Sequence, residues 1–396
     1  MWRPLLTGTT GETARDAAHA IAAALHDPMD WPARHAHQIA ILHAYVGDPE
    51  CAGAFMERAM SYVADTPLSP ALFGGVCGIA WALNHLDPDS EDAMGSVDEL
   101  VLKAIADTSS AIPYDLISGL VGLGVYALAR MPRASAQTIV RAIIVRLDDL
   151  ATRDVDGVCW LTLPSDRTAS GAGHYDLGIA HGAAGVIGFL ARVRRAGLDV
   201  ERVTPMLAGA LRWLTAHRLE VESSSRFASK VALDGTMDVA RSAWCYGDPG
   251  VALSLLAASA CGCPTARDVA LETAVTAASR DPGRSGVLDA GLCHGAAGLG
   301  HIFNRLHQAT GAPRLREAAT YWFTRCLSLR QAGSGIGGFQ SFLPSEDGRV
   351  RWADDASLLT GATGIALALL AASDEIEPRW DAMLLMDLDV GSLALT

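Results

Sequence analysis

Two kinds of helical segment alternate along the chain. Residues 185–191, 251–257 and 364–370 are apolar nearly all round, which is typical of helices that are buried on every side. Residues 135–150 and 203–217 instead carry apolar side chains at helical spacing and charged side chains on the remaining face. The pattern predicts an inner layer of buried helices and an outer layer of amphipathic helices.

A Gly-x-x-Gly motif accompanies the apolar segments and repeats along the chain. Its six copies begin at Gly75, Gly119, Gly182, Gly247, Gly295 and Gly361. Successive copies are 44 to 66 residues apart, which leaves room for the rest of one helix, a turn, a second helix and a loop. Paired glycines permit tight turns and a close approach of backbones where helices converge on one axis. Repeated hairpins of this kind predict an all-α fold, specifically an α/α toroid.

The repeat length also indicates how many hairpins to expect. The first 74 residues have room for one more, with helices expected at 13–26 and 32–46, and Gly8-Thr-Thr-Gly11 is either a degenerate motif or a simple helix start. We expect a double-layered barrel of about seven hairpins whose inner helices start at Gly-x-x-Gly. Residues 1–396 should form one toroid domain, because no linker divides them. Within long interruptions, residues 160–164 and 339–344 are expected to form short strands or lids.

Composition and charge restrict the class of protein. Half of the 396 residues are apolar and 19% are charged, which excludes a disordered or fibrous chain. No apolar run reaches the roughly 18 residues of a membrane span, and the first 16 residues lack the features of a signal peptide. We therefore expect a cytoplasmic protein. A formal net charge of -13 argues against nucleic acid as a partner, because phosphate contacts require a basic face.

Metal-type side chains occupy equivalent positions in neighbouring repeats. Cys245 and Cys293 lie two residues before the first glycine of their repeats, whereas His181, Tyr246 and His294 lie one residue before it. If the hairpins stack in order, these positions share one end of the barrel and the side chains converge. Two thiolates and one imidazole are ligands that zinc prefers. The register therefore predicts one zinc ion per chain on Cys245, Cys293 and His294, with the fourth position left to water or a substrate thiolate.

Other interpretations of the cysteines stay open at this point. A purely structural zinc would need a fourth protein ligand, for which Cys159 and Cys263 are the candidate thiols. Isolated buried residues are more simply explained as core, as for Cys51, Cys77, Cys326 and His301. With eight cysteines and no signal-peptide features, the chain is expected to carry thiols or metal ligands rather than a disulfide framework.

Four stretches of the sequence resemble one known family. They are Tyr114-Asp-Leu-Ile-Ser-Gly-Leu-Val-Gly122, Gly178-Ile-Ala-His-Gly-Ala-Ala-Gly185, Arg241-Ser-Ala-Trp-Cys-Tyr-Gly-Asp-Pro-Gly250 and Leu292-Cys-His-Gly-Ala-Ala-Gly298. From about residue 73 to 370 the chain resembles the lanthionine synthetase C family, the cyclases of lantibiotic biosynthesis. The resemblance implies an α/α toroid of about seven hairpins with zinc on Cys245, Cys293 and His294. Some members carry a small inserted domain, but the 44 residues between Gly75 and Gly119 leave no space for it.

The resemblance also implies a reaction and its partners. Free-standing members close lanthionine and methyllanthionine thioether rings in a dehydrated precursor peptide. The expected partner is therefore a dehydrated precursor with its leader, with a lanthipeptide dehydratase and a transporter as further partners. A peptide thiol, whose free pKa is about 8.5, would lose its proton on zinc and add to dehydroalanine or dehydrobutyrine.

The addition leaves an enolate that must be stabilised and then protonated at the α-carbon. His181 is suited to general acid/base catalysis because its reference pKa is about 6.5. Asp115, in the preceding repeat, would orient or charge the imidazole. Arg241 and Tyr246 flank Cys245 and would donate hydrogen bonds to the enolate oxygen. These four assignments match the family's active-site positions, although capping, surface charge or packing also accounts for each residue.

Other functions are compatible with parts of the sequence. A non-catalytic relative would bind zinc, glutathione or a peptide without closing rings. A prenyltransferase toroid also uses zinc to activate a peptide thiol, but its metal ligands include a carboxylate. A toroid glycoside hydrolase needs paired carboxylates, such as Asp115 and Asp354, and would leave the thiol cluster unexplained.

Overall fold

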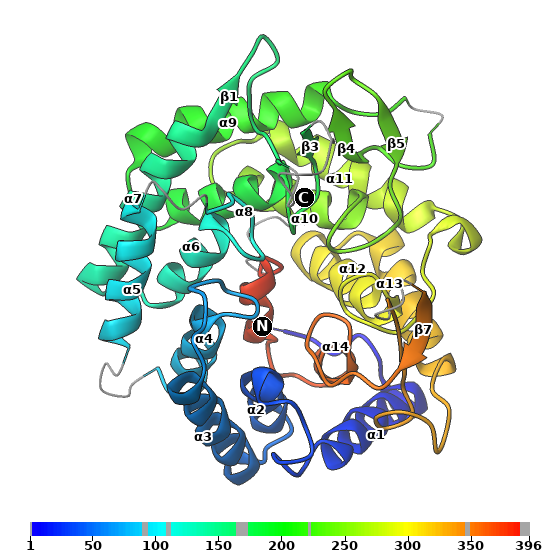
Figure 1. The fold of residues 1–396 in the computed structure, drawn as a ribbon. Helices are drawn as coiled ribbons and strands as arrows, with labels where there is room; N and C mark the ends of the chain where they lie inside the picture. The colour runs from blue at the N-terminus through cyan, green and yellow to red at the C-terminus, as the bar shows by residue number, and fades with distance from the viewer. Residues whose placement is uncertain are drawn as a thin grey trace.

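Two concentric rings of α-helices make up most of the structure (Figure 1). The structure, a computed structural model, describes residues 2–88, 94–107, 112–163, 173–220, 223–344 and 349–388. The inner ring consists of α2 (Ala36–Tyr45), α4 (Val76–Leu86), α6 (Leu120–Ala129), α8 (Ala183–Arg195), α10 (Asp248–Ala260), α12 (Ala296–Thr310) and α14 (Ala362–Ser373). Successive inner helices contact one another, and α14 contacts α2, so the ring is closed.

The outer ring covers the inner one. It consists of α1 (Gly8–Ala24), α3 (Pro49–Asp65), α5 (Gly95–Ala106), α7 (Ala134–Leu150), α9 (Val200–Ala216), α11 (Thr265–Ser279) and α13 (Pro313–Ser328). Each outer helix packs on the inner helix that precedes it, except α1, which packs on α14 and completes the circle. The predicted all-α toroid of about seven hairpins is therefore confirmed within the described ranges. The helices expected at 13–26 and 32–46 correspond to α1 and α2, whereas α3 was not foreseen.

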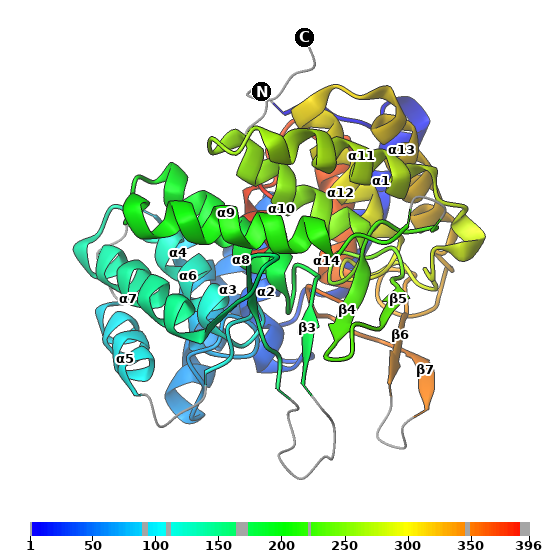
Figure 2. The same ribbon diagram turned by 90° about the horizontal axis from the view of Figure 1, so that it is seen from above.

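Short strands gather at one end of the barrel (Figure 2). The strands are β1 (Ala151–Arg153), β2 (Val158–Trp160), β3 (His174–Asp176), β4 (Ala228–Ala232), β5 (Met237–Val239), β6 (Ser341–Pro344) and β7 (Val350–Ala353), and the 3-10 helices are η1 (Ala33–His35), η2 (Pro282–Arg284) and η3 (Arg379–Leu384). The strands pair antiparallel as β1-β2, β3-β4-β5 and β6-β7. The strands expected at 160–164 and 339–344 are present in part as β2 and β6, and residue 164 lies outside the described residues.

The Gly-x-x-Gly motif marks the first turn of every inner helix except α2. In each copy the first glycine is the N-cap residue. A side chain on the second glycine would overlap the carbonyl oxygen of the residue six positions earlier, which is Leu72, Leu116, Ile179, Trp244, Leu292 or Leu358. Glycine is therefore required because the loop folds directly onto the helix that follows. Gly8-Thr-Thr-Gly11 is a simple helix start, since it begins the outer helix α1.

Backbone hydrogen bonds join the six loops before α4 to α14, each to the next, around the barrel. The bonds run from Phe73 N to Ile117 O (3.1 Å), Leu116 N to Ala180 O (3.1 Å), Ala180 N to Cys245 O (3.4 Å), Trp244 N to Cys293 O (2.9 Å) and Cys293 N to Leu359 O (2.7 Å). At α2, which lacks the motif, a side chain takes the place of the loop: Gln38 Oε1 accepts from Leu358 N at 2.7 Å. Equivalent positions of neighbouring repeats are therefore held side by side.

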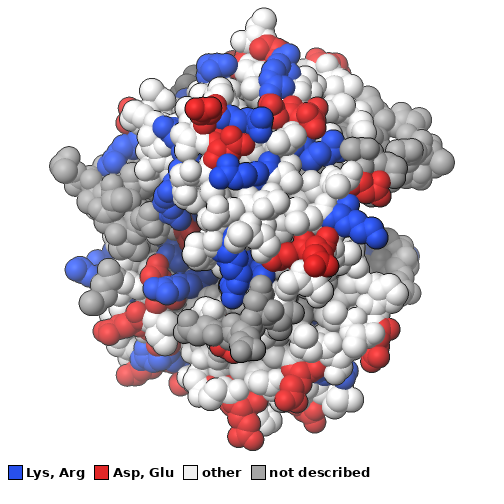
Figure 3. All heavy atoms as spheres, turned by 90° about the vertical axis from the view of Figure 1, so that its left-hand side faces the viewer, with Lys and Arg blue, Asp and Glu red and all other residues white. Residues whose placement is uncertain are grey.

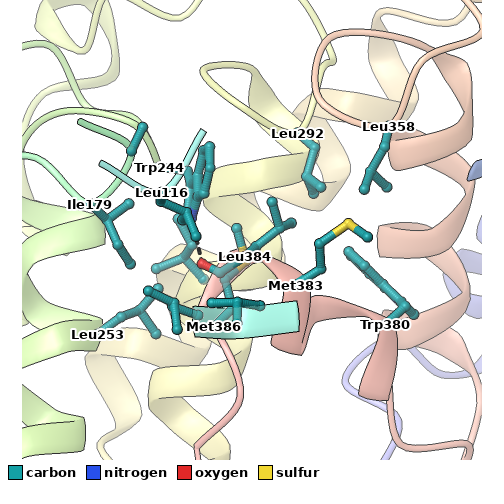
Figure 4. Packing of buried hydrophobic residues seen from close by; sticks show 14 of the residues in the cluster. Leu116, Ile179, Trp244, Leu253, Leu292, Leu358, Trp380, Met383, Leu384 and Met386 are labelled. Atoms are coloured by element: carbon teal, nitrogen blue, oxygen red, sulfur yellow. Dashed lines mark hydrogen bonds between the residues drawn. The ribbon is translucent and has the colours of Figure 1, made fainter. Parts of the chain in front are cut away.

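The C-terminal segment lies among the loop residues at the barrel centre (Figure 4). Its buried apolar side chains include Trp380, Met383, Leu384 and Met386. Trp244 Nε1 donates to the carbonyl oxygen of Leu384 at 3.0 Å. Asp381, which is fully buried, pairs with Arg305 at 2.6 Å and His301 at 2.7 Å, both on α12. The segment is therefore tied to the repeats that carry the predicted metal ligands.

Charges are mixed on the face of the barrel where α5 and α7 lie. Figure 3 shows basic and acidic side chains interspersed there, and Arg146 and Asp149 of α7 form an ion pair of 3.6 Å. Salt screens exposed charges beyond a Debye length of about 8 Å, and neighbouring charges of opposite sign offset each other, so the described residues of this face form no patch of one charge. Of the helices in the described ranges, none has both the length and the apolar character of a membrane span.

The glycine requirement predicts a large asymmetry between two substitutions. Gly364→Ala would place a methyl group against Leu358 O and should lower the free energy of unfolding by about 2 kcal/mol or more. Gly53→Ala, in the exposed interior of α3 with open space around it, should raise that free energy by about 0.5–1 kcal/mol. Urea denaturation measures both, and equal effects of the two substitutions would contradict the packing argument.

Candidate metal centre and active site

The three residues predicted to bind metal lie together at the loop end of the barrel. One ligand atom of each of Cys245, Cys293 and His294 lies within 4.8 Å of the others. Cys245 precedes α10, and the other two precede α12. The hydrogen bond from Trp244 N to Cys293 O joins these two loops directly. All three side chains are half-buried, so they can be reached from solvent.

The two thiols are not equivalent. A hydrogen bond from Cys293 lowers the pKa of Cys245, with further contributions from His294 and Arg241, although burial acts in the opposite direction. The same hydrogen bond and burial raise the pKa of Cys293. In this hydrogen-bonded pair, Cys245 is the side that favours the thiolate and Cys293 is the thiol that donates to it.

The donor set fits zinc. Two sulfurs and one imidazole nitrogen bind zinc at about 2.3 Å and 2.0–2.1 Å, which requires donor atoms that already lie near one another. Within the described ranges no fourth histidine, cysteine, aspartate or glutamate joins the group. Cys159 lies in β2, and Cys263 follows the far end of α10, where its sulfur is 3.7 Å from Arg194 Nη1. Neither thiol therefore supplies the fourth ligand that a purely structural site would need.

His181 and Asp115 form a hydrogen-bonded pair beside this group. His181 Nδ1 lies 2.7 Å from Asp115 Oδ2, and Ser118 N donates to Asp115 Oδ1 at 2.9 Å. The hydrogen bond between Leu116 N and Ala180 O aligns the two loops that carry the pair. Asp115 raises the pKa of His181, although burial opposes the shift. Because Nδ1 faces the carboxylate, Nε2 is the ring nitrogen left for a substrate.

Arg241 and Tyr246 border the same region. The Tyr246 ring lies 6.0 Å from the His181 ring, measured between centroids, with 27° between the planes. Burial, followed by the charge of Asp176, raises the pKa of Tyr246, so its hydroxyl is a neutral donor. The charge of Arg241 acts on Cys245, and its Nε is buried without a hydrogen-bond partner among the described residues. The structure therefore brings all seven predicted site residues to one end of the barrel.

Asp176 is part of this region but was not singled out in the sequence. Its Oδ2 accepts a hydrogen bond from Thr162 Oγ1 at 2.9 Å and lies 3.2 Å from His174 Nε2. Its negative charge also raises the pKa of His181. Asp176 precedes its first glycine by six residues, as Arg241 does in the next repeat. Extending the register to this position would have identified it.

Three other aspartates near these loops, Asp248, Asp354 and Asp355, have structural roles. Asp355 accepts from Ser357 N at 2.8 Å within the loop before α14. Exposed Asp354 accepts from Gln340 Nε2 at 3.0 Å. Asp248 does more than cap a helix, because its buried carboxylate accepts from Ser225 Oγ, Arg226 N and Phe227 N and so fixes the loop before β4.

Comparison with known proteins agrees with this architecture. The chain is a closed α/α toroid, and two cysteines and one histidine lie together at the loop end of its barrel. The family model for "Lanthionine synthetase C-like protein" matches residues 39–385. The chain therefore belongs to the lanthionine synthetase C-like family.

Two relatives illustrate the relationship. Nisin biosynthesis protein NisC of Lactococcus lactis subsp. lactis is 26% identical over 217 residues, which cover 48% of this chain and 51% of NisC. The chain thus spans about half the length of this curated relative. The solved structure of nisin cyclase covers 97% of this chain and 92% of its own, with a TM-score of 0.69 and 20% identity. The structural likeness supports the toroid fold.

The donor group predicts how metal content responds to substitution. Cys293→Ala and His294→Ala should each lower bound zinc by about one equivalent per chain, because a two-ligand site holds zinc weakly. Cys261→Ala is the matched control, since Cys261 is a half-buried thiol at the end of α10 outside the group. Metal analysis of the dialysed proteins measures the difference. Equal zinc in Cys293→Ala and Cys261→Ala would show that the group binds no metal.

Proposed function

We propose that this chain is a zinc-dependent lanthipeptide cyclase. It would add cysteine thiols of a dehydrated precursor peptide to dehydroalanine or dehydrobutyrine and so form lanthionine and methyllanthionine rings. The observation that carries the proposal is the position of the Cys245–Cys293–His294 group next to the His181–Asp115 pair. Family membership and the name nisin cyclase of the solved relative support it.

Ring closure needs a nucleophile that a free thiol does not provide at neutral pH. Cys245, Cys293 and His294 would hold zinc, which would bind the peptide sulfur as a thiolate and so supply the nucleophile. A free cysteine thiol, by comparison, has a pKa of about 8.5. The sulfur then forms a bond to the β-carbon, and the alkene π electrons move onto the α-carbon and carbonyl oxygen. The proton that the thiol loses is replaced by the proton that later reaches the α-carbon, so the peptide mass is unchanged and one free thiol is lost.

The remaining steps belong to this chain's own side chains. Arg241 and Tyr246 are donors suited to the enolate oxygen, where preorganised hydrogen bonds have their largest effect. His181 would then give a proton to the α-carbon from Nε2. Asp115 holds the ring by Nδ1 and favours its protonated form, which is the form that acts as a general acid.

The competing functions fit less well. A prenyltransferase set needs a carboxylate ligand, and the Cys245–Cys293–His294 group contains none. A glycoside hydrolase needs two free carboxylates, but Asp115 is bonded to His181 and Asp354 to Gln340. A non-catalytic zinc- or glutathione-binding relative would keep the metal group, but it would have no use for a proton donor beside it.

We extend the proposal to partners and location. The substrate would be a dehydrated precursor with its leader, and a lanthipeptide dehydratase and a transporter would act before and after ring closure. A cytoplasmic location suits this chemistry, because substrate thiols stay reduced there. All eight cysteines are unpaired thiols in the structure, in keeping with such a compartment.

The assignment of His181 predicts a separation between metal binding and turnover. His181→Ala should keep its zinc but close rings about 10²–10⁴-fold more slowly, because a positioned proton donor contributes that much. The assay follows loss of alkylatable thiol at constant mass in a dehydrated Cys-containing peptide. Cys293→Ala, which should lose both zinc and turnover, is the comparison. Full turnover by His181→Ala would remove the residue from the mechanism.

The Asp115 contact predicts a change in pH dependence. Since Asp115 raises the pKa of His181, Asp115→Asn lowers it. A protonated donor is lost as pH rises through its pKa, so the alkaline limb of the rate should move to lower pH in this variant. Asp354→Asn, which alters an exposed carboxylate, should leave the profile in place. Rate profiles at saturating peptide decide between these outcomes, and an unmoved limb in Asp115→Asn would exclude His181 as the proton donor.

A further inference from the structure

A second group of metal-type side chains lies where α1, α2 and α3 meet (Figure 1). One ligand atom of each of His26, Asp48 and Cys51 lies within 4.8 Å of the others. His26 follows α1, Asp48 is the N-cap residue of α3, and Cys51 lies in the first turn of α3. This junction follows the end of α2, whereas the catalytic group precedes the start of inner helices. The two groups therefore lie at opposite ends of the barrel.

His43, in the last turn of α2, lies beside Asp48 of this group and has an unpaired nitrogen, although it is outside the set of atoms that all lie within 4.8 Å of one another. Its side chain is 2% exposed, and Nε2 lies 3.0 Å from the carbonyl oxygen of Leu25. A carbonyl only accepts, so Nε2 carries the hydrogen and Nδ1 presents a lone pair. Nδ1 is buried without a hydrogen-bond partner among the described residues and lies 3.8 Å from Asp48 Oδ2.

Two acceptors therefore face each other, and the described residues place no donor between them; the Asp48 side chain is 39% exposed. The other oxygen of Asp48 is occupied, because Cys51 N donates to Oδ1 at 3.0 Å. The His43 ring is held in place by stacking on Phe55, with centroids 5.5 Å apart and planes 13° from parallel. A buried acceptor left in this state carries a free-energy cost, because it has lost its hydrogen bonds to water. A positive group between Nδ1 and Oδ2 removes that cost.

A proton on His43 is the simplest positive group, but the surroundings disfavour it. Burial is the largest influence on His43 and lowers its pKa, although the Leu25 carbonyl and Asp48 act in the opposite direction. A metal cation needs no such protonation, because it binds the neutral imidazole. The contact from Nε2 to a backbone carbonyl is also the usual second contact of a metal-binding histidine.

We propose that His26, His43, Asp48 and Cys51 form a second metal site for a divalent cation of the zinc class. Two imidazoles, a carboxylate and a thiolate are all zinc ligands, with bond lengths of about 2.0–2.3 Å. In the structure, Cys51 Sγ donates to the carbonyl oxygen of His26 at 3.3 Å. On metal binding, the thiol would give its proton to solvent, and Sγ would contact the metal in place of this carbonyl. His26 is exposed and gives the ion a path from solvent.

The site would have a structural role. It joins the end of α1, the end of α2 and the start of α3. These elements close the ring, and α2 is the inner helix that starts without a Gly-x-x-Gly motif. A cation shared by three elements stabilises the folded state by binding it in preference to the unfolded chain. The inference does not depend on ring-closing activity.

Zinc stoichiometry of the full chain tests the site. Each protein is stripped with a chelator, dialysed against zinc and analysed for zinc per chain. His26→Ala/Cys51→Ala, which leaves two of the four ligands, should lose about one equivalent, both alone and in the Cys293→Ala background. His19→Ala, which removes another exposed histidine of the α1 region, should lose none. Unchanged zinc in His26→Ala/Cys51→Ala would overturn the site. Unchanged zinc in Cys293→Ala would instead count against the catalytic centre, so the two failures are distinguishable.

Cobalt provides a readout that identifies the sulfur ligand. In the Cys245→Ala/Cys293→Ala double variant, the catalytic thiols are absent. Cobalt(II) should still give a thiolate-to-metal absorption band, and adding Cys51→Ser should abolish it while adding Cys261→Ser leaves it unchanged. Circular dichroism of each variant confirms that it is folded. A double variant without the band, or a band that survives Cys51→Ser, would overturn the assignment.

Discussion

The close approach of each pre-helix loop to the helix that follows is the constraint on which the rest of the structure depends. Because a side chain on the second glycine would overlap a backbone carbonyl, the loop and the first helical turn have one way of packing. That packing presents loop peptide groups to the neighbouring repeats, where they form hydrogen bonds around the barrel. The loop end is therefore held by main-chain contacts in addition to the apolar contacts of the helices.

A main-chain scaffold leaves the side chains before the glycines free to differ. In the repeat before α4, Phe73 and Gly74 occupy the two positions directly before the first glycine. A cysteine and a tyrosine occupy these positions before α10, and a cysteine and a histidine occupy them before α12. A backbone hydrogen bond to the next loop forms in each case, from the amide two or three residues before the first glycine, so reactive side chains occur there without a change of fold. The metal-type group arises because two adjacent repeats both carry thiols at the position that the scaffold brings together.

The features that repeat could be predicted from the sequence, and those that occur once could not. The toroid and the convergence of Cys245, Cys293, His294 and His181 follow from a register that can be counted. Closure at α2 by Gln38 could not be predicted, because this helix has no motif to align. The same applies to Cys51, which was interpreted as a core residue. Its neighbours come from the ends of three different helices, and only the folded chain shows that they meet.

The two ends of the barrel also differ in electrostatic character. Inner helices begin at the loop end, where the aligned peptide dipoles of each helix give a partial positive charge that favours thiolates and a developing enolate. At the opposite end, the carbonyl groups that finish α1 and α2 give a partial negative charge that favours a cation near His26 and His43, whereas the start of α3 acts against it and is offset by the Asp48 carboxylate. A reaction that builds up negative charge is therefore better placed before α10 and α12. A site whose role is to hold a cation is better placed where α1 and α2 end.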